Sequence, residues 1–164
     1  MLTGKEDLLQ ALIEAYLMEK GTKDFYSQAA QRAVAPEAKE IFAALSGWEE
    51  KHMGFIRFLY QAIQDDRDFR GFGDFERRSH SPVTEGGIPV EELEARLENV
   101  GFSDDPGAIA MALELEGKAH ALYRKLSESA ADGNAKVVFL EMADQEARHI
   151  GYLEKAKAAL SATP

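Results

Sequence analysis

Two segments of this chain repeat one another, and this repeat restricts the fold more than any other feature of the sequence. When residues 11–57 are laid on residues 108–154 with a constant shift of 97 and no gap, eleven of the 47 positions are identical. Alanine matches carry little weight in an alanine-rich sequence, but the polar and aromatic matches do. Glu19, Tyr26, Glu49 and His52 recur in register as Glu116, Tyr123, Glu146 and His149.

Glycine and proline are concentrated between the two repeats. Six of the thirteen glycines and three of the five prolines lie within residues 65–107, whereas the flanking stretches are rich in Ala, Leu, Glu and Lys. Because glycine and proline disfavour helix interiors, two long helices are predicted on each side of a looser connection. The predicted helices run from Thr3 to about Ala33, from Pro36 to about Gln64, from Asp105 to a C-cap at Gly133, and from Ala135 almost to the end.

Local signals support these bounds. Thr3 and Glu6 have the spacing of a capping box, Pro36 suits a first helical turn, and Asn134 suits an N-cap. Within the connection, residues 89–101 are predicted to form a short extra helix.

The pattern predicts an all-α fold, a four-helix bundle in which residues 1–164 form a single domain. Short turns make the two helices of each block antiparallel neighbours. The long crossover between the second and third helices can run the length of the bundle, so these two helices are expected to be parallel.

Each predicted helix carries an apolar stripe that a carboxylate interrupts. In the first and third helices a glutamate precedes a tyrosine by seven residues, and in the second and fourth a glutamate precedes a histidine by three. These spacings keep both residues on the apolar face. At about 1.5 Å per residue, all four glutamates lie roughly 21 to 24 Å from the predicted turns, which places them in one interior layer.

Four ionised carboxylates in a dry layer need compensating charge. No Lys or Arg lies on these inner faces. Two divalent cations would supply four positive charges, and ligation by carboxylates with one imidazole each suits iron or manganese, with zinc also able to bind. A dinuclear metal site is therefore predicted. The alternative is a bundle whose glutamates reach solvent through an imperfect interior.

The composition excludes several other classes of function. The 29 acidic and 19 basic residues give a formal charge of −10, which argues against a nucleic-acid or anionic membrane partner. The absence of cysteine excludes thiol catalysis and thiolate metal sites in this chain. Charged residues interrupt every apolar stretch, so neither a membrane span nor a secretory signal is expected and a cytoplasmic location is predicted.

With these motifs the chain resembles the ferritin-like di-iron carboxylate proteins, and within them the rubrerythrins. The resemblance covers both helical blocks and implies two bound iron ions and a homodimer. It also implies that Tyr26 and Tyr123 hydrogen-bond ligand carboxylates; the alternative is that they are ordinary core tyrosines. The implied iron ligands are Glu19, Glu49, His52, Glu116, Glu146 and His149, with Glu49 and Glu146 bridging.

Two departures from the rubrerythrin pattern affect the expected chemistry. Rubrerythrins usually carry a rubredoxin domain with a cysteine-ligated iron, so a chain without cysteine is expected to need an external electron donor, such as a rubredoxin-like protein. They also place a further glutamate one turn after the third-helix ligand, where this chain has Ala119, which puts peroxidase chemistry dependent on that group in doubt. His120 is expected either to act at the metal or to be an interface or core histidine.

Other residues receive structural interpretations. Trp48 is expected to pack in the core or at an interface. Gly54 and Gly151, each two residues after a histidine, are expected to permit close helix approach near the site. His80 is expected to be solvated, and residues 69–75 to pack over the bundle or exchange between subunits.

Three functions are compatible with this pattern. The first is an oxidoreductase in which a diferrous centre reacts with peroxide or dioxygen. The second is iron handling or ferroxidation without an organic substrate. The third is a structural or sensory bundle that bound metal stabilises.

Overall fold

A computed structural model describes residues 4–64, 91–92 and 105–162. Within these residues the chain forms long α-helices and no β-strand, so the predicted all-α bundle is confirmed. Glu91 and Glu92, in the predicted short helix, are helical; the rest of that helix, His80 and residues 69–75 lie outside the described residues. The four long helices are α1 (Lys5–Arg32), α2 (Pro36–Gln64), α5 (Asp105–Ser129) and α6 (Gly133–Ser161).

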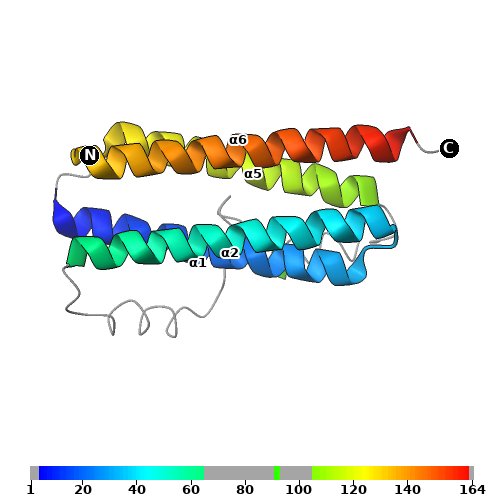
Figure 1. Cartoon of the computed structure of the whole chain (residues 1–164), viewed down its shortest axis with the longest axis horizontal. Coiled ribbons are helices and arrows are strands. Elements are labelled where there is room, and N and C mark those ends of the chain that lie inside the picture. Colours follow the sequence, from blue (N-terminus) through cyan, green and yellow to red (C-terminus); the bar gives the residue numbers. More distant parts are fainter. Residues whose placement is uncertain (1–3, 65–90, 93–104, 163–164) are drawn as a thin grey trace.

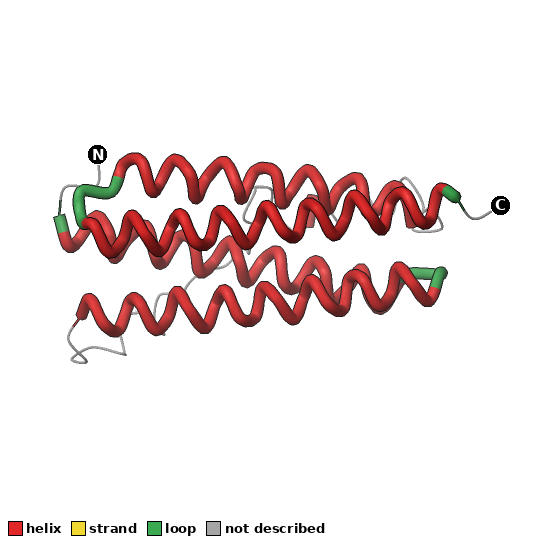
Figure 2. The backbone as a smooth tube through the Cα atoms, turned by 45° about the horizontal axis from the view of Figure 1, so that its top comes forward, coloured by secondary structure: helices red, strands yellow, loops and turns green. Residues whose placement is uncertain are grey.

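The helices form two antiparallel hairpins, α1 with α2 and α5 with α6, that lie along one another (Figure 1). Helices α2 and α5 run in the same direction, as the long crossover predicted (Figure 1). The α1–α2 turn and the α5–α6 turn lie at opposite ends of the bundle (Figure 2). Each of the four helices therefore passes through the middle of the bundle.

Helix starts follow local chemistry, although the predicted C-cap at Gly133 and N-cap at Asn134 are wrong: α5 ends at Ser129, and Gly133 is the first residue of α6. Gly4 is the N-cap of α1, and Thr3 of the predicted capping box lies outside the described residues. Asp132, not Asn134, caps α6: its carboxylate accepts a hydrogen bond from the backbone N–H of Ala135 at 2.9 Å. This three-residue spacing satisfies an amide of the first helical turn.

A buried carboxylate at the start of α5 ties the two hairpins together. Asp105, only 7% exposed, accepts hydrogen bonds from the backbone N–H groups of Val34 at 3.3 Å and Ala35 at 2.8 Å. These amides belong to the α1–α2 turn. The contact fixes the register of α5 against the first hairpin and hence the level of every side chain further along α5.

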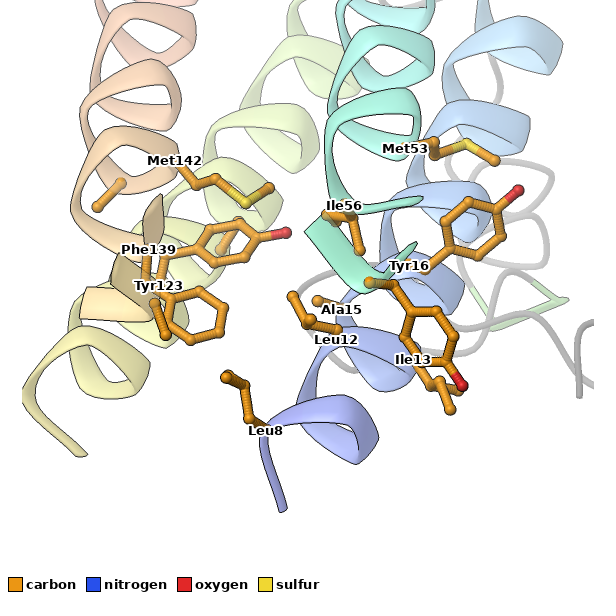
Figure 3. Close-up of a cluster of buried hydrophobic side chains, with 14 residues drawn as sticks. Leu8, Leu12, Ile13, Ala15, Tyr16, Met53, Ile56, Tyr123, Phe139 and Met142 are labelled. Atoms are coloured by element: carbon orange, nitrogen blue, oxygen red, sulfur yellow. The ribbon is translucent and has the colours of Figure 1, made fainter. Parts of the chain in front are cut away.

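The apolar core has two parts along the bundle, separated by a polar layer. One cluster lies toward the α1–α2 turn and includes Phe25, Phe42, Leu45, Ile109 and Leu115. The other lies toward the opposite end and includes Leu12, Tyr16, Ile56, Phe139 and Met142 (Figure 3). No described helix is long and apolar enough to cross a membrane.

Candidate metal centre

The polar layer contains the six predicted ligands, and all of them are buried. The four glutamates are 0% exposed, and the two histidines are 3% and 5% exposed. The alternative in which the glutamates reach solvent is therefore excluded. Helices α1 and α5 each supply one glutamate, and α2 and α6 each supply a glutamate and a histidine one turn apart: Glu19, Glu116, Glu49 with His52, and Glu146 with His149.

The first group of ligand atoms surrounds His52. Its Nδ1 lies 3.3 Å from Glu19 Oε2, 3.2 Å from Glu49 Oε2 and 3.0 Å from Glu146 Oε1. One donor atom from each of the four residues lies within 4.8 Å of all the others. Three carboxylates and one imidazole thus converge on a volume that a single cation can fill.

The second group surrounds His149 in the same way. Its Nδ1 lies 3.2 Å from Glu116 Oε2, 3.4 Å from Glu49 Oε1 and 3.1 Å from Glu146 Oε2. These four residues also place donor atoms within 4.8 Å of one another. The two groups correspond to each other under the sequence repeat.

Glu49 and Glu146 belong to both groups. Each directs one carboxylate oxygen toward His52 and the other toward His149. Although the imidazole nitrogens are close, none of these four buried oxygens has a hydrogen-bond partner of good geometry in the described part of the chain. Unpartnered buried carboxylate oxygens are costly unless a cation neutralises them. The arrangement suits two cations that share both carboxylates as bridges.

The two tyrosines cross between the hairpins. Tyr26 on α1 donates a hydrogen bond to Glu116 Oε1 at 2.5 Å, and Tyr123 on α5 donates to Glu19 Oε1. Each bond occupies one oxygen of a carboxylate and leaves Oε2 beside a histidine. They are therefore more than packing residues, since they orient the two carboxylates that belong to one group each.

Burial and crowding raise the pKa values of two of the carboxylates, Glu49 and Glu116. Burial, reinforced by the negative charges of Glu19, Glu146 and Glu116, raises the pKa of Glu49 well above its usual value. Burial is also the main cause that raises the pKa of Glu116 to about 8. Without metal, the layer therefore retains protons on part of its acids at neutral pH.

The histidines compensate the remaining negative charge. Burial alone would lower the pKa of His149, but contacts with Glu116, Glu146 and Glu49 raise it to about 12. Burial likewise opposes protonation of His52, yet the charge of Glu19 and contacts with neighbouring carboxylates raise its pKa strongly. Burial would raise the pKa of Glu146, but its contacts with Glu116 and both imidazoles lower it. Without metal, protons on the histidines and on part of the glutamates thus compensate the negative charge that two cations would otherwise neutralise.

A cavity of about 230 Å³ lies over the histidines between α2 and α6, lined by Trp48, Lys51, His52, Gln145, Arg148 and His149. The indole ring of Trp48 stacks on the imidazole of His149, with centroids 4.9 Å apart and planes 15° from parallel. The expected core packing of Trp48 is confirmed, since it packs half-buried against the apolar cluster that includes Phe42 and Leu45, but the sequence did not predict the stack on His149. The sequence did offer one indication of this contact: Trp48 directly precedes Glu49, so it lies at the height of the metal layer.

Other described residues near the layer take no part in the two groups of ligand atoms. Ala119 is buried in the apolar core, and His120 is half-buried and belongs to neither group of ligand atoms among the described residues. The expectation for Gly54 and Gly151 is wrong. A Cβ added at either position would meet no atom within 4 Å, because neither glycine faces the bundle interior.

Comparison with known proteins bears directly on this centre. The Rubrerythrin family model matches residues 108–163, which include most of α5, all of α6 and the ligand candidates Glu116, Glu146 and His149. Residues 108–163 are thus similar to the rubrerythrins. The unmatched α1–α2 hairpin repeats the matched segment in register and completes both groups of ligand atoms. No curated protein and no solved structure matches the chain.

Proposed function

We propose that this chain binds two iron ions at the glutamate–histidine layer and is an oxidoreductase that reacts with peroxide or dioxygen. The proposal rests on one observation above all. Glu49 and Glu146 each divide their oxygens between two histidine-centred groups and lack good hydrogen-bond donors there. Iron is favoured over manganese or zinc because rubrerythrins typically bind iron and because mixed carboxylate and imidazole ligation suits it.

Bound to this layer, two ferrous ions would supply electrons and Lewis acidity to an O–O bond. The protein's own part is positioning. Glu49 and Glu146 would each offer one oxygen to either ion, while Tyr26 and Tyr123 keep one oxygen of each remaining carboxylate occupied. Complete burial of the four glutamates keeps bulk water out of the layer.

Metal analysis of alanine variants tests the site. Wild-type protein loaded anaerobically with Fe²⁺ is expected to hold two metal ions per chain, and Glu49→Ala or Glu146→Ala to lose both because each carboxylate serves both groups. Glu50→Ala and Glu154→Ala are matched controls, since these exposed glutamates lie on the same helices and should leave the metal content unchanged. Retention of two metals by both bridging variants would show that the site assignment is wrong.

Oxidation kinetics separate the proposed reaction from its alternatives. An oxidoreductase should oxidise bound Fe²⁺ rapidly with peroxide or dioxygen and turn over repeatedly when a reductant is supplied. A ferroxidase or iron-handling protein would stop after one stoichiometric event or form mineral. A metal-stabilised structural or sensory bundle would gain melting temperature on loading without any oxidation.

The proposed turnover needs electrons from outside this chain, which has no cysteine to ligate a second iron centre. We therefore propose an external electron donor, for which a rubredoxin-like protein is the first candidate to assay. We further propose a homodimer, which sedimentation or light scattering of the purified protein tests directly. Neither proposal alters the ligand assignment.

A further inference from the structure

The sequence repeat is broken at one pair of positions in the cavity over the histidines. Under the shift of 97, Trp48 corresponds to Gln145, whereas the other cavity positions pair like with like. Trp48 is the only tryptophan in the chain. The two groups of ligand atoms thus have the same chemistry but different neighbours. The like pairs are Lys51 with Arg148 and His52 with His149.

The break places an aromatic ring against one histidine only. The His149 ring stacks on Trp48 at 4.9 Å and on His52 at 5.1 Å, with interplanar angles of 15° and 14°. Trp48 is itself held by the ring of Tyr152, whose centroid lies 5.0 Å away at 72°. The position equivalent to Trp48 beside His52 is occupied by the non-aromatic Gln145.

Depth does not distinguish the two histidines. His52 is 3% exposed and His149 is 5% exposed, and the Nδ1 of each faces three carboxylates within 3.4 Å. The main difference at the cavity face is therefore the indole that restrains the His149 ring. A ligand side chain already held in its binding orientation loses less freedom when the metal arrives.

Resting on the proposed metal centre, we propose that the two metal positions load in order, His149 before His52, because Trp48 holds the His149 imidazole in its ligating orientation. Trp48 is thus a positioning residue that acts through His149. Restraint of one side chain gives the first position an affinity about 2- to 12-fold above that of the second.

The order can be measured without any turnover. Metal-free protein with ¹⁵N-labelled histidine rings is titrated with Zn²⁺, and the ring signals of His52 and His149 are followed by NMR. In the wild type, the His149 signals should respond mainly to the first equivalent and the His52 signals to the second. Glu116→Gln should weaken the tighter step, and its repeat counterpart Glu19→Gln the weaker one.

Substitutions at the broken pair then test the cause. Trp48→Gln makes the pair alike and should bring the two steps together. The double variant Trp48→Gln, Gln145→Trp moves the ring to the other half and should make His52 respond first. Trp48→Phe retains a stacked ring and should keep the wild-type order, which a general packing defect would not explain.

Two kinds of failure are distinguishable. If the wild type binds no Zn²⁺ at the two histidines, the proposed metal centre itself is overturned. If it binds two ions but both histidines respond together, or if the order persists in Trp48→Gln and in the exchanged variant, the metal centre stands and the role of Trp48 is refuted.

Discussion

Replacing Glu49 by glutamine should stabilise the metal-free protein while abolishing its response to metal. Glu49 is fully buried beside three other carboxylates, and burial and their charges raise its pKa. Glutamine has nearly the same shape, carries no charge and can donate to a neighbouring carboxylate. Because its pKa is raised, Glu49 takes up a proton on folding at neutral pH, and removing this cost is worth about 1 to 4 kcal/mol, at ~1.4 kcal/mol per pH unit above the unfolded pKa. At ~3 °C per kcal/mol for a chain of this size, the melting temperature should rise by roughly 3 to 12 °C.

The pH dependence of this gain has a defined sign. A carboxyl group whose folded-state pKa lies above its unfolded value costs stability as pH rises past the unfolded value. Because the pKa of Glu49 is raised, the advantage of Glu49→Gln should be absent near pH 4 and grow toward neutral pH and beyond. The variant lacks a carboxylate that belongs to both groups of ligand atoms. It should therefore bind metal poorly, and metal should no longer raise its melting temperature.

Thermal unfolding followed by circular dichroism, with chelator and with metal, measures both effects. At a metal concentration 100 times Kd, the wild type should gain about 2.7 kcal/mol for each of the two sites. Glu50→Gln is the control, because this exposed neighbour should change neither value. The reasoning is refuted if Glu49→Gln melts below the wild type in chelator at neutral pH, or if metal stabilises both proteins equally.

Three further results are expected. Tyr26→Phe and Tyr123→Phe should each lower metal affinity by about 10- to 100-fold in competition with a chelator, because each removes the donor that orients a carboxylate; unchanged affinity would show that these tyrosines only pack. Metal loading at pH 7 should release protons and tighten with rising pH, since the pKa of His149 is about 12; equal calorimetric enthalpies in buffers of different ionisation enthalpy would contradict this. Asp105→Ala should reduce the unfolding free energy by about 2 to 4 kcal/mol in urea, because two turn amides lose a charged acceptor, while exposed Asp144→Ala should behave as wild type.

The layer was predictable because helical periodicity converts sequence spacing into position. Glu19 and Glu116 lie at similar distances from their turns as the glutamates of the E-x-x-H motifs, so counting residues placed all four carboxylates at one level. The direction of α5 followed from the length of the connection that precedes it. A single E-x-x-H motif can occur by chance. Two such motifs, each in register with a further glutamate and a tyrosine, are improbable by chance and therefore made the site prediction specific.

The remaining features depend on contacts that one helix does not encode. Asp132 and Asn134 are both good capping residues two positions apart, and residue type alone does not decide which of them begins α6. The stacking of Trp48 on His149 joins α2 to α6, so it depends on the crossing of the two hairpins. The expectation for Gly54 rested on its being two residues from His52 in sequence. Residues two apart on a helix do not face the same side, so Gly54 points away from the site.

Each ligand group takes three residues from one repeat and one from the other, and each tyrosine bonds across the same boundary. A single hairpin thus lacks a complete ligand set, and two free, identical hairpins would have to associate as a symmetric pair to build one. In such a pair every residue occurs twice, so an indole beside one histidine would also lie beside the other. Fusing two copies into one polypeptide removes that constraint. Duplication followed by fusion therefore lets mutation tune the two halves of one dinuclear centre separately, as positions 48 and 145 already show.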